Sequence, residues 1–281
     1  MEKDLGRRKN LETHVAYLGP EGTFCEQAAK KYFSTAIFIS YSNITDVFTA
    51  VEIGNTEYGV VPTENSTDGS IPLTLDSLLE SNVMICGEIE IKVVHNLIAK
   101  PVTKLNEIEV ILSHPQALAQ CRQFIKSEFP RAELREVSST AKAVELLKAI
   151  DNAAAIGTEA AANSRGMTVL KRQIEDASSN VTRFFVLAKE DAKPSGKDKT
   201  SLVFSAKHVP GSLYRILEVF AVMNINLTKI ESRPDKKRPW NYVFYLDFEG
   251  HRTDAMVRET LDSMRKRCIN LKVLGSYPRT T

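Results

Sequence analysis

Short apolar runs alternate with segments that carry helix-start signals through the first two thirds of the chain. Strands are expected at residues 15–18, 36–41, 58–61, 110–112, 134–137 and 153–156. A helix is expected after most of them: Thr23 stands three residues before Glu26, the spacing of a capping box. This alternation with short connections predicts an α/β domain with mainly parallel sheets. Two further apolar stretches, around 83–85 and 88–99, make a long mid-chain crossing that suggests two lobes.

A late strand is expected at residues 184–188, directly after the polar pair Thr182 and Arg183. We interpret it as a return of the chain that joins the lobes. A hydroxyl and a guanidinium at the mouth of a buried strand indicate chemistry there. The guanidinium can bind a carboxylate through two parallel hydrogen bonds, although Arg183 could equally pair with a structural carboxylate.

The pattern changes after the polar run 189–199, which contains Pro194 and Gly196. The elements expected beyond it are a strand, a helix, two strands, a helix and a strand. This βαββαβ order predicts a ferredoxin-like domain. The domain plan is therefore a loose extension (1–14), a two-lobed domain (15–188), a linker (189–199) and a second domain (200–281).

Composition excludes several classes of function. The net charge of the 281 residues is +2, which gives no electrostatic case for a nucleic acid or an anionic membrane as partner. No apolar run approaches the roughly 18 residues of a membrane span, and the charged N-terminus does not look like a secretory signal, so a cytoplasmic location is expected. The four cysteines are scattered, and the chain has no P-loop or GxGxxG motif. We expect neither a metal nor a cofactor.

Polar residues occupy four strand-to-helix junctions, at 22–23, 64–66, 113–114 and 157–158. In open α/β sheets, ligands bind beyond the carboxyl ends of the strands, where helix N-termini offer free N–H groups. Gln116 and Gln120 share one helix face near the third junction, and they could be merely solvated. Thr23 and Ser113 are also explained as ordinary helix caps, and His114 as a structural histidine. The residues alone predict a pocket for a small carboxylated molecule.

Five short motifs occur together along the chain: GPEGTF at 19–24, PTENS at 62–66, SHPQ at 113–116, TRF at 182–184 and ESRP at 231–234. Their order and spacing resemble those of prephenate dehydratases. The resemblance implies a type II periplasmic-binding-protein fold with the active site between two lobes. It also implies a C-terminal ACT domain that senses phenylalanine. Because no chorismate mutase helix precedes residue 15, we expect a monofunctional enzyme.

The family reaction converts prephenate to phenylpyruvate with loss of water and carbon dioxide, the work of a carbon–oxygen lyase. By resemblance, Thr182 donates a proton to the departing hydroxyl or positions the donor. The other catalytic candidates are Glu64 and Asn65. The substrate-binding candidates are Thr23, Ser66, Ser113, Gln120, Arg183 and Phe184. We expect Arg183 to bind the pyruvyl side chain and neutral donors to meet the ring carboxylate, because a cation there would oppose its departure.

The resemblance also assigns an effector site for L-phenylalanine to the second domain. Its candidate residues are Gly211, Ser212, Leu213, Glu231, Ser232, Arg233 and Pro234. Ser212 stands where the family usually has alanine. ACT domains commonly pair edge to edge, which implies a homodimer or homotetramer. The alternatives are an arogenate dehydratase, which performs the same chemistry on an aminated side chain, and a non-catalytic protein that binds a small carboxylate.

Overall fold

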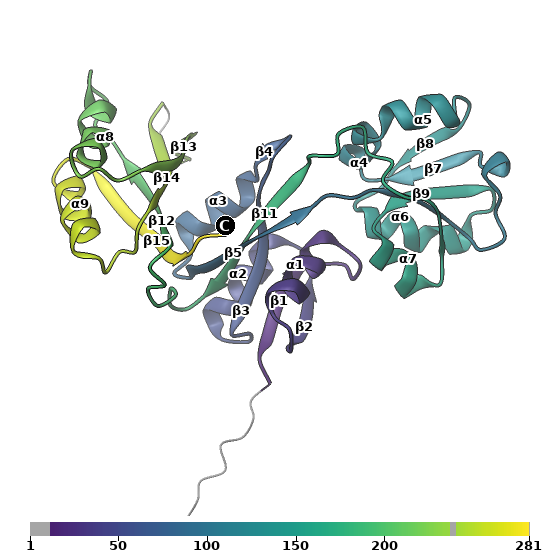
Figure 1. Cartoon of the computed structure of the whole chain (residues 1–281), viewed down its shortest axis with the longest axis horizontal. Coiled ribbons are helices and arrows are strands. Elements are labelled where there is room, and N and C mark those ends of the chain that lie inside the picture. The colour runs from purple at the N-terminus through teal and green to yellow at the C-terminus, as the bar shows by residue number, and fades with distance from the viewer. Residues whose placement is uncertain (1–11, 237–239, 281) are drawn as a thin grey trace, which may run out of the picture.

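Two α/β lobes and a C-terminal sheet domain follow one another in space (Figure 1). The computed structural model describes residues 12–236 and 240–280. Most of the expected extension, residues 1–14, therefore lies outside the described residues.

Lobe one is built on a mixed sheet in the order β2-β1-β3-β11-β5, with β4 paired to β3. Its strands are β1 (His14–Leu18), β2 (Ile37–Tyr41), β3 (Tyr58–Asn65), β4 (Gly69–Ser70), β5 (Met84–Lys92) and β11 (Val181–Ala188). Its helices are α1 (Phe24–Tyr32), α2 (Ile44–Ile53) and α3 (Pro72–Glu80). β1 runs parallel to β2 and β3, and β11 runs antiparallel between β3 and β5. The late strand is thus the return expected from the sequence.

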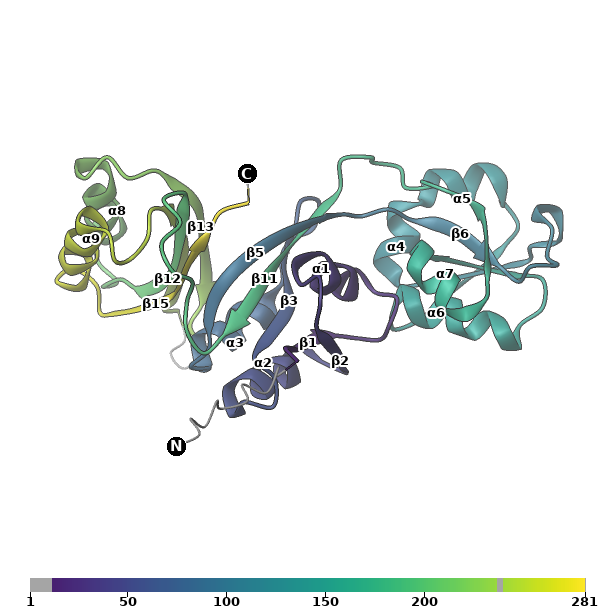
Figure 2. The same ribbon diagram turned by 60° about the horizontal axis from the view of Figure 1, so that its bottom comes forward.

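Lobe two contains a second sheet in the order β10-β6-β9-β7-β8. Its strands are β6 (Asn96–Ala99), β7 (Val110–Ser113), β8 (Glu133–Glu136), β9 (Ala153–Gly157) and β10 (Thr168–Lys171). Its helices are α4 (Pro115–Gln120), α5 (Arg122–Glu128), α6 (Thr140–Leu146) and α7 (Glu159–Arg165), with 3-10 turns at Leu105–Glu107 and Leu147–Ala149. The chain crosses between the lobes from β5 to β6 and again from β10 to β11 (Figure 2).

The C-terminal domain has the predicted βαββαβ order. Its elements are β12 (Asp198–Ser205), α8 (Ser212–Val222), β13 (Leu227–Pro234), β14 (Tyr242–Glu249), α9 (Ala255–Arg265) and β15 (Asn270–Pro278). The antiparallel sheet β13-β14-β12-β15 packs one face against α8 and α9. Its other face shares a core with lobe one, in which Tyr245 and Leu274 are buried together with Ile85. A side chain at Gly275 would collide with the Ile85 backbone, so the two sheets approach closely.

The predicted fold class, a two-lobed α/β domain followed by a ferredoxin-like domain, is confirmed. Three elements were missed: α3, the two-residue β4 and β10. The stretch 88–99 contains the end of β5 and all of β6, with a break after Lys92. The sheets are mixed rather than mainly parallel, because β11 and β6 run antiparallel to their neighbours.

Candidate active site

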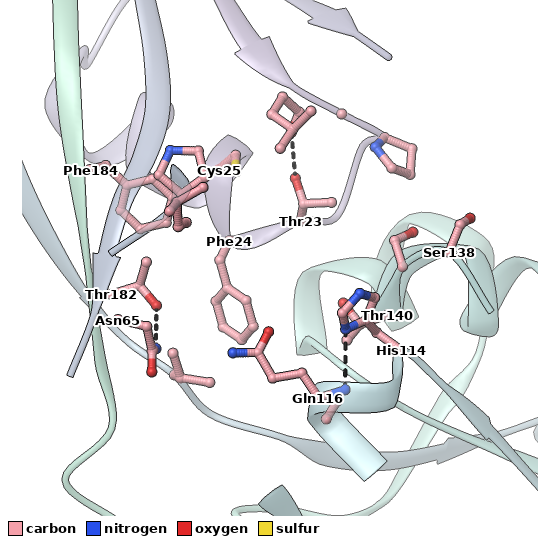
Figure 3. A pocket seen from close by; sticks show the side chains of 18 of the residues that line it. Thr23, Phe24, Cys25, Asn65, His114, Gln116, Ser138, Thr140, Thr182 and Phe184 are labelled. Atoms are coloured by element: carbon pink, nitrogen blue, oxygen red, sulfur yellow. Dashed lines mark hydrogen bonds between the residues drawn. The ribbon is translucent and has the colours of Figure 1, made fainter. Parts of the chain in front are cut away.

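A cavity of about 500 Å³ lies in the cleft between the lobes. Lobe one contributes Thr23, Phe24, Asn65, Thr182 and Phe184, and lobe two contributes His114, Gln116, Gln120, Ser138, Ser139 and Thr140. Figure 3 shows Thr182 and Asn65 on one side of the cleft and His114 and Gln116 on the other, with the Phe24 ring between them. The sequence predicted a ligand site at the junctions between strands and helices, and residues of these junctions line this cleft.

The Thr182 hydroxyl is held by Asn65. Strand pairing places Thr182 directly opposite Asn65 on β3, and Asn65 Nδ2 donates to Thr182 Oγ1 at 2.9 Å. Asn65 Oδ1 accepts the backbone N–H groups of Thr67 and Asp68, which fixes the amide orientation. Since Thr182 Oγ1 is an acceptor in this bond, its own proton is available to a molecule in the cleft. The pair is therefore arranged as a proton donor with a supporting N–H group.

The cleft is neutral. Among the described residues, those that line it include no Asp, Glu, Lys or Arg. Its polar groups are hydroxyls, side-chain amides and imidazoles, together with the start of α1, where Thr23 Oγ1 accepts the N–H of Glu26. A carboxylate bound here meets neutral donors and the positive end of a helix dipole.

His95, which was not expected from the sequence, also lines the cleft. Its Nε2 lies 2.9 Å from Gln120 Oε1, and Gln120 Nε2 donates to Asp68 Oδ2 at 3.1 Å. Because the Gln120 amide nitrogen faces the carboxylate, its oxygen accepts and His95 Nε2 carries the proton. Burial lowers the pKa of His95, although Gln120 and Glu175 oppose this effect. The imidazole is neutral, and its buried Nδ1 has no partner among the described residues.

A sequence signal for His95 existed: the polar pair His95 and Asn96 separates two apolar pairs, residues 93–94 and 97–98, and breaks the alternation that precedes it. Gln116, already noted for sharing a helix face with Gln120, lines the cleft as well. Thr23, Asn65, Gln120, Thr182 and Phe184 are brought together as expected.

The structure places Arg183 outside the cleft, contrary to the expectation that it binds a substrate carboxylate. Its guanidinium donates to Glu88 at 2.7 Å, to Asp247 at 2.9 Å and to the Tyr277 hydroxyl at 3.0 Å. Successive side chains of a strand point to opposite faces, so a cleft-facing Thr182 turns Arg183 towards the C-terminal domain. Burial alone would lower the pKa of Arg183, but Tyr277 and the two carboxylates raise it overall.

Three other candidates also lie away from the cleft. Glu64 pairs with Arg183 across β3 and β11, and its carboxylate lies 3.0 Å from Lys229 Nζ. Ser113 is fully buried and donates to the Ile156 carbonyl at 2.7 Å, a structural bond within lobe two. Ser66 Oγ accepts the N–H of Val181 at 3.0 Å and so ties the turn after β3 to β11.

The effector candidates separate into two places. Gly211, Ser212 and Leu213 line a pocket of about 530 Å³ on the C-terminal domain, together with Ala206, Lys207, His208, Val209, Pro210, Tyr214, Asn241, Tyr242 and Phe244. The second group, residues 231–234, lies on β13, where Glu231 and Arg233 reach lobe one instead. Arg233 Nη2 lies 3.5 Å from Asp76 Oδ1 on α3. Among the described residues of one chain, the two groups do not line a common pocket.

No helix in the described ranges is long and apolar enough to cross a membrane. Residues 12–236 and 240–280 also contain no cluster of His, Cys, Asp or Glu that could hold a metal ion.

Fold and cleft together define a class: a two-lobed α/β protein with a ligand-sized cleft between its lobes and an attached ferredoxin-like domain. The family model "Prephenate dehydratase" matches residues 15–192, and the model "ACT domain" matches residues 200–265. The chain belongs to the prephenate dehydratase family, whose members are decarboxylating dehydratases.

Individual relatives agree with the family models. The chain is 46% identical over 266 residues to a bifunctional chorismate mutase/prephenate dehydratase of Aquifex aeolicus, covering 94% of this chain and 73% of that protein. It is 42% identical to a prephenate dehydratase of Methanocaldococcus jannaschii, covering 94% and 97%. The crystal structure of an Arthrobacter aurescens prephenate dehydratase in complex with L-Phe superposes with a TM-score of 0.88 at 33% identity, covering 95% and 90%.

Proposed function

We propose that the cleft is where this chain converts prephenate to phenylpyruvate, with loss of water and carbon dioxide. One observation carries the assignment of the site. The Thr182 hydroxyl lines a neutral cleft and accepts a hydrogen bond from Asn65, which leaves its proton for the substrate. Family membership supplies the reaction, and this geometry supplies a donor for its most difficult step.

The difficult step is the departure of hydroxide. As the ring carboxylate leaves as carbon dioxide, the electron pair of the broken C–C bond enters the ring and expels the hydroxyl at the opposite carbon. The ring becomes aromatic, and the leaving oxygen takes a proton and departs as water. A positioned proton donor typically contributes about 10²–10⁴ in rate. Thr182 gives that proton and regains one from solvent, so the reaction consumes one proton in total.

Threonine is a weak acid, so its proton must move while carbon dioxide is leaving. The Asn65 Nδ2–H group that points at Thr182 Oγ1 stabilises the negative charge that develops there, as a preorganised donor does in an oxyanion hole. Asn65 is itself held by the turn that follows it and by Asn180, whose Oδ1 lies 2.7 Å from Asn65 Nδ2. We therefore assign Thr182 as the proton donor and Asn65 as its supporting group.

Neutral groups bind the two carboxylates in this proposal. The hydroxyls of Ser138, Ser139 and Thr140 lie on lobe two, and the start of α1 at Thr23 lies on lobe one. A cation against the ring carboxylate would stabilise the charge that has to be lost, so neutral donors favour turnover. With Arg183 engaged elsewhere, the pyruvyl carboxylate is also left to neutral donors.

The neutral lining also bears on arogenate, whose side chain carries an ammonium group. An ammonium bound in the cleft needs a carboxylate partner, and none lines the cleft in the described residues. The nearby Asp68 carboxylate already accepts from Gln116 and Gln120. These contacts favour prephenate, and the family's catalytic relatives favour an enzyme over a non-catalytic binding protein.

We further propose that L-phenylalanine regulates the enzyme through the ACT domain. The match to an ACT domain and the L-Phe complex of the Arthrobacter aurescens enzyme support this. The domain plan (15–188, 189–199 and 200–281) is supported by the ranges of the two family matches. A homodimer or homotetramer and a cytoplasmic location complete the proposal, supported by the edge-to-edge pairing common to ACT domains and by the biosynthetic relatives.

The test is to incubate the protein with prephenate or arogenate and to follow ring aromatisation, with and without phenylalanine. We expect phenylpyruvate from prephenate, a slower reaction or none from arogenate, and a change of rate when phenylalanine is added. No aromatic product from either substrate would remove the enzyme assignment. Faster turnover of arogenate would transfer the assignment to that substrate.

A further inference from the structure

Asn180 stands directly before β11, two residues ahead of Thr182, and is buried with 4% of its surface exposed. Its Oδ1 accepts from Asn65 Nδ2 at 2.7 Å, while the same nitrogen donates to Thr182 Oγ1 at 2.9 Å. Among the described residues, those that line the cleft include Asn65 and Thr182 but not Asn180. Asn180 therefore reaches a molecule in the cleft through Asn65 and Thr182 rather than by direct contact.

The side-chain amide of Asn65 has all of its hydrogen-bonding positions filled. Such an amide offers two N–H donors and two acceptor lone pairs. The two donors go to Asn180 and Thr182. Oδ1 accepts from the backbone N–H groups of Thr67 and Asp68. Turning the amide over would break all of these bonds, so its nitrogen is fixed towards Thr182.

Asn180 is itself held by two neighbouring segments. Its backbone carbonyl accepts the N–H of Val93 at 2.9 Å, just beyond the end of β5. Ser66 Oγ accepts the N–H of Val181 at 3.0 Å and lies 3.4 Å from Asn180 Oδ1. The acceptor oxygen of Asn180 therefore has a fixed place beside Asn65.

This acceptor is neutral, which matters for the charge on Thr182. Asn180 Oδ1 and Thr182 Oγ1 share one donor nitrogen, so their separation cannot exceed the sum of the two hydrogen-bond distances, 2.7 and 2.9 Å. A carboxylate in place of the Asn180 amide would accept from Asn65 more strongly. At so short a distance, however, its charge would oppose the negative charge that develops on Thr182 Oγ1 as the proton leaves.

We propose that Asn180 is a positioning residue for the proton donor, because it supplies a buried, neutral acceptor that holds Asn65 Nδ2 towards Thr182. The amide oxygen keeps Asn65 in place without adding a charge beside the hydroxyl that loses its proton. The inference rests on the proposed function, since it takes Thr182 as the donor and prephenate as the substrate. It goes further by requiring an amide, and not a carboxylate, at residue 180.

The first test compares Asn180→Ala with Asn180→Asp by kcat at saturating prephenate. Asn180→Ala removes the acceptor and is expected to lower kcat roughly tenfold, the equivalent of one hydrogen bond. Asn180→Asp keeps the shape and the acceptor, but its charge is expected to lower kcat further, by roughly a hundredfold. If Asn180 only stabilised the fold, the order would be reversed, because a carboxylate holds Asn65 and a methyl group does not. A kcat in Asn180→Asp equal to or above that in Asn180→Ala would overturn the inference.

The second test places Asn180→Ala in the Thr182→Val background. If Asn180 acts through the Thr182 hydroxyl, its effect on kcat is expected to shrink from about tenfold to less than about twofold once that hydroxyl is absent. A purely structural role would lower kcat by the same factor in both backgrounds, and that result would contradict the inference.

The matched control is Asn96→Ala. Asn96 is another buried amide, and its Nδ2 donates to the Gly157 carbonyl at 3.3 Å within lobe two. It is not among the described residues that line the cleft. Asn96→Ala is expected to keep kcat within about twofold of the wild type. An equal loss of kcat in Asn96→Ala and Asn180→Ala would assign the effect to the loss of any buried amide and would sink the proposal.

A third measurement does not depend on turnover. In Asn180→Ala, hydrogen exchange of the backbone amides of Thr67 and Asp68, which donate to Asn65 Oδ1, is expected to rise roughly fivefold. Asn180→Asp and Asn96→Ala are expected to stay within about twofold of the wild type. If the wild type makes no phenylpyruvate, the proposed function fails, while exchange still decides whether Asn180 holds Asn65. Unchanged exchange in Asn180→Ala would contradict the positioning role even in a fully active enzyme.

Discussion

The cleft and the interface with the ACT domain lie on opposite faces of the same strands, and they have opposite chemistry. On the cleft face, Thr182 and Asn65 meet a lining without charged side chains in the described residues. On the other face, Arg183 lies among Glu64, Glu88 and Asp247, and the Glu88 and Asp247 side chains are 2% and 8% exposed. One pair of neighbours, Thr182 and Arg183, serves both regions.

The difference shows where each region obtains its charge. At the interface, both the positive and the negative side chains belong to the protein and form ion pairs with one another. Charged side chains can be buried only when they are paired in this way. In the cleft, the charge arrives with the substrate, and part of it must leave as carbon dioxide. Cationic side chains therefore stabilise the interface, whereas in the cleft they would hinder the loss of carbon dioxide. Alternation along β11 keeps the guanidinium away from the reacting carboxylate.

The largest effect is expected for Thr182→Val, which removes the hydroxyl with little change in shape. We expect kcat to fall by about 10²–10⁴ with little change in KM, because the proton donor is lost while the binding groups remain. Steady-state formation of phenylpyruvate measures it. Thr182→Ser keeps the hydroxyl and should remain within about tenfold of the wild type. Equal rates for the valine and serine variants would show that the hydroxyl is not the donor.

Arg183→Met should act on stability. It leaves Glu88 and Asp247 buried with fewer partners, although Lys199 still pairs with Glu88 at 2.9 Å. We expect the free energy of unfolding to fall by about 3–5 kcal/mol in urea titrations. Arg172→Met is the control, because its pair with Glu159 is exposed and screened by solvent, so its loss should change the free energy of unfolding little. Similar losses in both variants would contradict the contrast between a buried and an exposed ion pair.

His95 should make stability depend on pH. Burial lowers its pKa, so the unfolded chain takes up a proton near pH 6.5 that the folded protein does not. The His95 contribution is fully present above about pH 6.5 and is lost as the pH falls towards the folded pKa, by at most about 1.4 kcal/mol per pH unit. Urea titrations from pH 5 to pH 8 on the wild type and His95→Gln measure it. An acid-side decline of the same slope in both proteins would exclude His95 as its source.

The smallest effect is expected for Ser113→Ala. Its hydroxyl donates to a buried carbonyl and does not line the cleft, so the loss is one hydrogen bond, or about 1 kcal/mol of unfolding free energy. KM for prephenate should be unchanged. An increase in KM without a loss of stability would restore Ser113 to the substrate site.

Much of the fold could be predicted from local signals. Thr23 and Thr158 cap helices through side-chain hydrogen bonds, as their positions in the sequence suggested, but the cap expected at Ser113 is wrong, because the N-cap of α4 is His114. The α3 helix was missed because its N-cap, Ile71, makes no side-chain cap bond. The strand β4 has two residues and no pattern of its own.

The site was harder to predict, because a motif fixes which residues are near one another in sequence but not which face they occupy. Glu64 and Asn65 are neighbours in one motif, yet one faces Lys229 and the other Thr182. The face follows from the register of β3 with β11, which joins residues more than a hundred positions apart. His95 was missed because it lies between β5 and β6, where the chain crosses between the lobes. The sequence placed that crossing only approximately.

The most direct test of the account is KM for prephenate in Arg183→Met, measured under conditions in which the variant is fully folded. Because the guanidinium lies on the ACT side of β11, away from the cleft, we predict a KM within about threefold of the wild type. If Arg183 bound the pyruvyl carboxylate, the loss of a charged hydrogen bond would raise KM roughly tenfold to a hundredfold. A rise of that size would contradict the division between a neutral cleft and a charged interface.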